Sequence, residues 1–172
     1  MSIKHIITAL CICCMISPAL SAQKKSKKEA AQPEGYQFET VIEIPTTPIK
    51  NQSSTGTCWC FSALSFFESE ILRNGYTEPL DLSEMFIVHK SYQEKAEKFV
   101  RLHGVLNFGQ GSSFGNVLYG LKNYGIVPES EMPGLNYGTD THRHGELSGV
   151  LSAYLDVIIR NPNRQLSTAW QR

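Results

Sequence analysis

A cysteine at the start of an amphipathic helix, with a glutamine six residues before it, constrains this chain more than any other feature. The stretch is PIKNQSSTGTCWCFS over residues 48–62, with Gln52 and Cys58 at those two positions. Unpaired N–H groups and the dipole of a helix N-terminus favour a thiolate. A glutamine amide beside that sulfur can donate a hydrogen bond to an oxyanion. The pattern predicts a nucleophilic thiol at Cys58, because such a thiol needs both features.

A second cysteine, Cys60, competes for this role. It falls on an apolar stripe with Leu64 and Phe67, so we expect it to be a core thiol. Positions i and i+2 of a helix point to different faces, so we expect no disulfide between Cys58 and Cys60. Glu68 belongs to the more polar positions around the stripe.

The first 22 residues show the three parts of a secretory signal. A charged start precedes an apolar run over 6–16, and small residues follow up to Ala22. The run is too short to span a bilayer. We therefore predict a signal peptide over 1–22, export to the periplasm or the medium, and no membrane attachment after cleavage. A lysine-rich flexible linker is expected over 23–35, and a folded domain over 36–172.

The charge balance gives no sign of a polyanionic partner. The chain has 16 basic and 16 acidic side chains, and a nucleic-acid-binding protein needs a basic patch. We therefore expect no nucleic-acid partner.

The apolar pattern predicts a mostly helical domain. Residues 36–44 alternate like a strand, and residues 126–128 read as short and extended. Helical spacing predicts helices from Cys58 to a cap at Asn74-Gly75, from a Ser83 cap toward Leu102, over 114–123, over 147–159, and a further start over 167–172.

Two other signals are weaker. His142 and His144, followed by Glu146, could present ligands to zinc, but no further ligand motif accompanies them. The glycine-rich stretch over 109–115 fits neither dinucleotide nor P-loop spacing and lacks the lysine. We assign no metal and no cofactor, and we expect the glycine-rich stretch to contact a substrate backbone.

The motif around Cys58 resembles the nucleophile segment of papain-like cysteine peptidases. Three further segments resemble the same family in the same order: Leu82-Ser83-Glu84, Gly111-Ser112 and the sequence NYGIVP over 123–128. The spacing from Gly111 to Pro128 is most similar to that of bleomycin-hydrolase-type aminopeptidases, the aminopeptidase C group. The resemblance covers roughly residues 36–132.

This resemblance implies a papain-like α+β fold and hydrolysis of peptide bonds through an acyl-enzyme on Cys58. Gln52 would stabilise the oxyanion. Gly111, Ser112 and Trp59 would contact a peptide or protein substrate, which Gly111 and Ser112 align as an added strand. Aminopeptidase action is preferred over endopeptidase action, and a homo-oligomer is compatible with the resemblance.

Three positions depart from the family pattern. Thr55 stands where extracellular members have a disulfide cysteine, and bleomycin-hydrolase-type relatives share this departure. Cys60 stands where alanine is usual. Ser112 replaces the second glycine and is expected to crowd the substrate backbone.

The main departure from the family pattern concerns the general base. The family's histidine and asparagine lie roughly 130–150 residues after the cysteine, beyond residue 172 here. No histidine of the chain stands in a family-like context, so we expect a truncated domain in which the helical lobe is present and the β-rich lobe is missing. The alternative function is a catalytically inactive domain that acts as a peptide-binding or interaction module.

Overall fold

The computed structural model describes residues 35–36, 38–161 and 165–166. The chain divides into two units, residues 1–40 and residues 41–172. Within the first unit, residues 35–36 and 38–40 have no regular structure. Three predicted segments lie outside the described residues. They are the signal peptide, the linker up to residue 34 and the helix start over 167–172.

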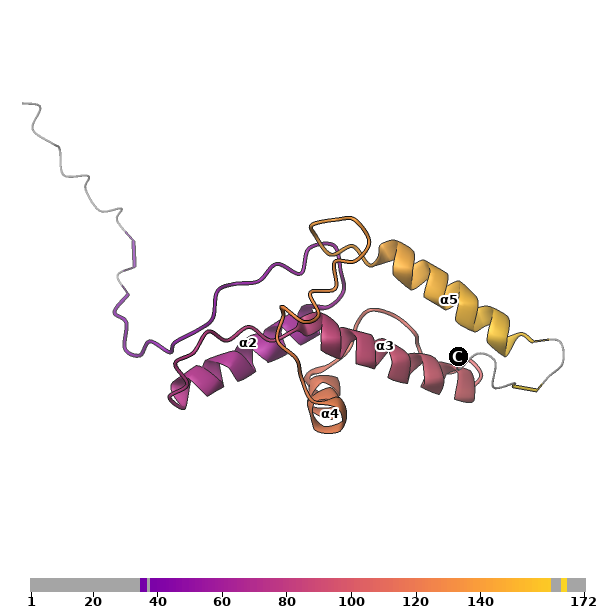
Figure 1. The fold of residues 1–172 in the computed structure, drawn as a ribbon, viewed down its shortest axis with the longest axis horizontal. Helices are drawn as coiled ribbons and strands as arrows, with labels where there is room; N and C mark the ends of the chain where they lie inside the picture. Colours follow the sequence, from indigo (N-terminus) through magenta and orange to yellow (C-terminus); the bar gives the residue numbers. More distant parts are fainter. Residues whose placement is uncertain (1–34, 37, 162–164, 167–172) are drawn as a thin grey trace, which may run out of the picture. The chain divides into compact units, whose positions relative to one another are not determined.

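Helices make up the regular structure of the second unit. Its described residues form α2 (Cys58–Arg73), α3 (Glu84–Arg101), α4 (Phe114–Tyr124) and α5 (Gly145–Ile159), which Figure 1 shows in chain order. All four of these helices were predicted, although α5 begins two residues earlier than expected. None of them combines the length and the apolar character that crossing a bilayer requires.

β-pairing is confined to two isolated bridges within the described residues. Ser54 pairs with Arg143 in parallel, and Leu82 pairs with Pro128 in antiparallel orientation. The second bridge includes backbone hydrogen bonds from Ser83 to Val127 and from Glu129 to Asp81. The extended structure predicted over 126–128 is therefore confirmed.

The strand predicted over 36–44 is wrong for the residues that the structure describes there. Residues 36 and 38–44 form no strand and are exposed. Val41 keeps 87% of its surface exposed, and Ile42 keeps 78%. A strand needs a partner for its backbone N–H and C=O groups, and alternating side chains do not supply one.

The helix ends follow local sequence signals. Gly75 has φ of +94°, and its N–H donates to the carbonyl of Leu72, which closes α2 as the Asn74-Gly75 pair predicts. At the start of α3, the Ser83 hydroxyl accepts a hydrogen bond of 3.0 Å from the N–H of Phe86. Both predicted caps are confirmed.

The core lies where α2, α3 and α4 meet. α4 packs so closely on α3 that a Cβ added at Gly120 would lie 3.1 Å from Cδ1 of Ile87. α5 contacts α3 and buries Leu155. The buried core residues are Trp59, Cys60, Ala63, Leu64, Met85, Ile87, Val88 and Val117. The first turn of α2 therefore packs into the core through Trp59 and Cys60, whereas Cys58 is not part of the core.

Candidate active site

The two cysteines at the start of α2 have opposite surroundings. Both are free thiols, with Cys58 exposed and Cys60 fully buried. Cys60 donates from Sγ to the carbonyl of Glu84 at 3.4 Å, and burial raises the pKa of the Cys60 thiol. The structure thereby confirms that Cys60 is a core thiol and that the two cysteines do not pair.

The first turn of α2 is not capped by its N-cap residue. Thr57 makes no side-chain hydrogen bond to the helix, and its hydroxyl pairs with that of Thr55 instead. Cys58 is the first residue of the helix, at the end where backbone N–H groups lack intrahelical partners. This arrangement leaves N–H groups beside the Cys58 thiol for a negatively charged atom.

Gln52 is held by the loop that leads to Cys58. Its Nε2 donates to the carbonyl of Thr55 at 2.8 Å, and the Thr55 hydroxyl donates to the carbonyl of Gln52 at 3.0 Å. The side-chain amide has two N–H donors, and this loop contact uses one. Gln52 is therefore fixed in orientation and keeps one donor.

A partly buried ionic cluster anchors the chain just before Gln52. Lys50 Nζ lies 3.0 Å from Glu68, 2.9 Å from Glu84 and 2.6 Å from Asp81. It also donates to the carbonyl of Leu82 at 3.0 Å. Burial alone would lower the pKa of Lys50, but its hydrogen bonds to the three carboxylates outweigh this effect, so the pKa of Lys50 is raised. Lys50 is charged and ties this segment to α2 and α3.

Glu68 is a residue whose position the sequence did not reveal. It was expected among the polar positions around the α2 stripe, and the structure buries it completely. Its carboxylate accepts hydrogen bonds from Lys50, from the Thr47 hydroxyl and from the N–H of Leu82. Those donors come from 14 to 21 residues away in sequence, so helical periodicity could not indicate them.

Gly56 approaches another part of the protein. Its N–H donates to Oε1 of Gln110 at 2.7 Å, and a Cβ added at Gly56 would lie 2.9 Å from Cβ of Gln110. Only glycine fits this contact without a shift of the neighbouring chain. The glycine therefore brings the Cys58 loop against the glycine-rich segment over 109–112.

Trp59 connects α2 to the same segment. It is 8% exposed and belongs to the core, and its Nε1 donates to the carbonyl of Gln110 at 3.0 Å. Its expected contact with substrate stays a prediction.

Lys95 on α3 binds the backbone of the glycine-rich segment. Its Nζ donates to the carbonyl of Gly109 at 3.0 Å and to that of Gly111. Gly111 is exposed, with open space where a Cβ would stand, and the Ser112 hydroxyl has no partner among the described residues. The sequence does not indicate these contacts of Lys95 and Gln110, because a lysine on a charged helix is expected to be solvated.

The predicted histidine pair lies beside the Cys58 loop. Ser54 donates to the carbonyl of His142 at 3.0 Å, and His144 donates from its backbone to the carbonyl of Ser54 at 3.3 Å. The side chains are 9% and 4% exposed, and burial lowers the pKa of both. Among the described residues, no three His, Cys, Asp or Glu side chains are placed to hold a metal ion.

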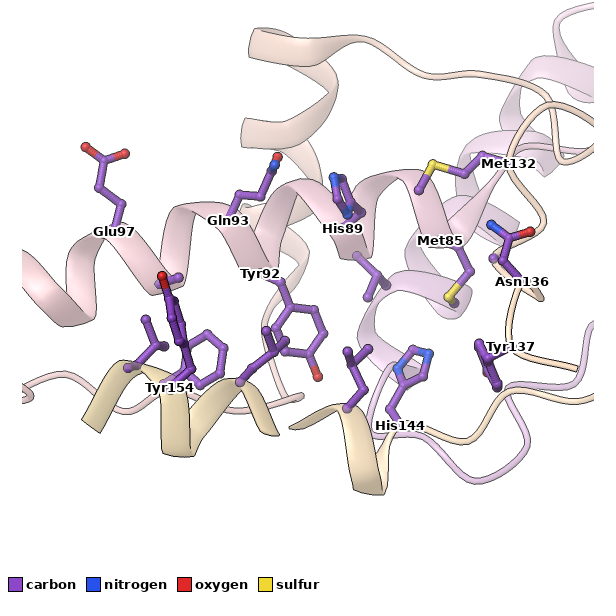
Figure 2. A pocket seen from close by; sticks show the side chains of 17 residues that line it. Met85, His89, Tyr92, Gln93, Glu97, Met132, Asn136, Tyr137, His144 and Tyr154 are labelled. Carbon is purple, nitrogen blue, oxygen red and sulfur yellow. The ribbon is translucent and has the colours of Figure 1, made fainter. Parts of the chain in front are cut away.

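Two hollows lie near these elements. A cavity of about 810 Å³ lies between α3 and α5, and Figure 2 shows Tyr92 and His144 within it. Neither Cys58 nor Gln52 lines this cavity. A shallower groove of about 600 Å³ borders the predicted site instead, lined by Ser53, Ser54, Thr55, Gly56, Gln110, Gly145 and Ser148.

Comparison with known proteins identifies the family. A profile of the Peptidase C1-like family matches residues 13–107. The mitochondrial cysteine proteinase 1 of Saccharomyces cerevisiae is 29% identical over 125 residues, which cover 62% of this chain and 25% of the relative. Aminopeptidase C of Lactococcus lactis subsp. lactis is 27% identical over 109 residues, which cover 55% of this chain and 25% of the relative.

The chain spans about a quarter of the length of these relatives. Their names match the resemblance drawn from Cys58, Leu82-Ser83-Glu84 and Gly111, and the helical described part agrees with the expected helical lobe. This chain belongs to the Peptidase C1-like family.

Proposed function

We propose that this chain carries the nucleophile, the oxyanion donors and a substrate-contacting segment of an aminopeptidase-like cysteine peptidase. The observation that carries the proposal is the contrast between Cys58, exposed at an uncapped helix N-terminus, and Cys60, buried in the core. Such a helix end favours a thiolate and supplies N–H donors, which is what a cysteine nucleophile needs.

The reaction follows from these groups. The Cys58 thiolate adds to the carbonyl carbon of a peptide bond, and the oxyanion accepts hydrogen bonds from the free N–H of Gln52 and the backbone N–H of Cys58. Collapse breaks the C–N bond and releases the amine, which takes a proton from a general acid. Water then hydrolyses the thioester, releasing the carboxylate product and restoring the thiolate.

We propose that the general base lies outside the described residues. Within that part of the chain, no histidine is hydrogen-bonded to Cys58. The relatives are about four times longer than the matched stretch, so their length allows a histidine and an asparagine on another lobe.

The proposed substrate is a peptide with a free amino terminus. Gly111 is exposed, with open space where a Cβ would stand, so an added peptide strand can approach its backbone. The preference for aminopeptidase over endopeptidase action is supported by the name of the Lactococcus lactis relative.

Thiol labelling tests the nucleophile. At pH 6, iodoacetamide reacts slowly with an ordinary thiol, whose pKa is about 8.5. Peptide mapping by mass spectrometry should show Cys58 labelled within minutes and Cys60 unlabelled, and in the Cys58→Ser variant the peptide that contains residues 58 and 60 should carry no label. Equally slow labelling of both thiols would reject the proposal.

Hydrolysis of an aminoacyl-coumarin tests the activity in the gene product that carries this chain. Cys58→Ser should lower kcat/KM at least a thousandfold, because no alternative nucleophile stands at the helix start. Unchanged hydrolysis in that variant would assign the activity to another group.

The alternative function is a peptide-binding module without catalysis. The observation that favours it is that no described histidine is hydrogen-bonded to Cys58 while the Gly111 segment is held in place. In this case peptide binding, measured by calorimetry, would be unaffected by Cys58→Ser, and no hydrolysis would be detected.

We also propose that the protein is exported and loses residues 1–22. The support is the order of charged, apolar and small residues at the start of the sequence. N-terminal sequencing of the protein isolated from its native cells should begin near Gln23, and a start at residue 1 or 2 would reject the proposal.

A further inference from the structure

Three successive carbonyls of the glycine-rich segment are all bound to side chains of the helices beneath it. Lys95 Nζ donates hydrogen bonds to the carbonyls of Gly109 and Gly111. Trp59 Nε1 donates one to the carbonyl of Gln110 at 3.0 Å. The segment is therefore fixed to α2 and α3 through its backbone, independently of its own side chains.

Lys95 is not an ordinary surface lysine. Its ammonium lies 5.7 Å from the ring centroid of Trp59 and 6.0 Å from that of Tyr92, both within the range of cation–π attraction. The side chain is half-buried, and none of the ion pairs among the described residues involves it. Its partners are two carbonyls and two ring faces, and an ammonium with three donors suits the carbonyls.

Without Lys95 the carbonyls of Gly109 and Gly111 would lose this donor, and the hydrogen bonds that remain would hold Gln110 alone, through Trp59 and Gly56. Gly109 and Gly111 have no side chains and lose more conformational freedom on ordering than other residues. A strand added beside a backbone binds through main-chain hydrogen bonds, so a mobile backbone would have to be ordered by the ligand at a cost in affinity.

We propose that Lys95 is a positioning residue that holds residues 109–112 in the conformation that aligns a peptide substrate. This inference rests on the proposed function, because it assumes that a peptide lies on this segment during attack by Cys58. Lys95 does not touch the reacting atoms. It acts through the carbonyls of Gly109 and Gly111.

Two alkylating reagents separate positioning from general damage. A dipeptidyl chloromethyl ketone needs the segment to align its peptide part before the thiolate displaces chloride and forms the C–S bond. Iodoacetamide reacts with the same thiolate, losing iodide, and is too small to need the segment. Both reactions are measured on the gene product that carries this chain, with and without the Lys95→Met change.

Lys95→Met should raise the half-saturating concentration of the peptidyl reagent about tenfold, the change that ordering about one residue implies. The rate with iodoacetamide should not change. Lys95→Arg should restore most of the peptidyl affinity, because it keeps a cation with several donors. Lys98→Met is the matched control, since Lys98 lies on the same helix with 56% of its side chain exposed.

The outcomes are distinct. If wild-type Cys58 reacts with neither reagent faster than an ordinary thiol, the proposed function fails. If wild type reacts with both and Lys95→Met changes neither rate, or slows both equally, the inference about Lys95 is overturned. Should Lys95→Met not fold by thermal melting, Lys95→Gln replaces it. Glutamine has one donor group for two carbonyls, so Lys95→Gln is expected to lose less affinity for the peptidyl reagent than Lys95→Met and to react normally with iodoacetamide. Slower reaction with both reagents would again overturn the inference.

Discussion

At the scale of single residues, burial separates groups that look alike in the sequence. Cys58 and Cys60 differ because two residues along a helix change the direction of a side chain, and this difference could be read from the apolar stripe. Glu68 and Glu129 could not be assigned in this way. Glu68 is fully buried and Glu129 is partly buried, and the charged groups around each carboxylate lie far away in the sequence.

Glu129 provides a pH-dependent prediction. Burial, followed by the negative charges of Glu84 and Asp81, raises its pKa from 4.5 to about 7. Between these values the folded protein binds more protons than the unfolded chain, so the free energy of unfolding falls as pH rises from about 4.5 to 7. Glu129→Gln removes this pH-dependent part of the free energy of unfolding, because glutamine does not titrate. The stability of the variant relative to wild type should therefore increase over that interval, measured by urea unfolding at several pH values.

Glu131→Gln is the control, because Glu131 is exposed two residues further along. Its stability curve should run parallel to that of wild type. A parallel curve for Glu129→Gln as well would show that the folded protein does not perturb the Glu129 carboxyl. Comparing each variant with wild type cancels the titration of other groups, including the buried His142 and His144.

At the scale of elements, the start of α2 is placed by two loops as well as by its own core contacts. The loop over 50–57 is fixed by Lys50, and the segment over 109–112 is fixed by Lys95 and Trp59. Gly56 joins the two through Gln110. The helix boundaries were predictable because caps are local, whereas the contact between these loops joins residues 54 positions apart.

Gly56→Ala tests this junction. The new Cβ would lie 2.9 Å from Cβ of Gln110, an atom fixed to the backbone that cannot move aside like the end of a long side chain. We expect a loss of about 1–3 kcal/mol in the free energy of unfolding, the usual cost of overpacking. Chemical denaturation measures it, and an unchanged stability would show that the two loops can separate.

Gly149→Ala is the matched substitution with the opposite expectation. Gly149 lies inside α5, and an added Cβ there meets nothing within 4 Å. Alanine should stabilise the helix by about 0.5–1 kcal/mol, because glycine loses more backbone entropy on folding. Equal losses in both variants would argue that the effect at Gly56 is not steric.

At the scale of the whole molecule, the described chain exposes apolar surface on α5. Leu147, Val150, Tyr154 and Val157 are all exposed and recur at spacings of three and four residues, so they lie along one face of the helix. Leu155 is buried on the side where α5 meets α3. An apolar stripe of this kind favours association.

We expect residues 23–172 alone to self-associate in a concentration-dependent way. Val150→Glu should weaken the association at least about tenfold, as expected when a charge replaces a valine whose burial contributes about 1.5–3 kcal/mol. Analytical ultracentrifugation measures this. Gly149→Glu places the same charge at an exposed position of α5 that lies off this stripe, where an added Cβ meets nothing within 4 Å, and it should have little effect. A monomer at all concentrations would contradict the prediction.

The sequence alone determined the features that depend on neighbouring residues. These are the four helices, the caps at Ser83 and Gly75, the buried position of Cys60 and the family to which the Cys58 motif belongs. Each follows from periodicity, capping or a contiguous motif, whose physics acts over a few residues.

Tertiary structure decided the features that need distant partners. The strand predicted over 36–44 does not form in the described residues, because no other strand pairs with it. The buried carboxylate of Glu68 accepts a hydrogen bond from Lys50, and the carbonyl of Gly111 accepts one from Lys95. The sequence around a charged side chain does not predict which distant carbonyl or carboxylate that side chain will bind. Only the folded chain brings those groups within hydrogen-bonding distance.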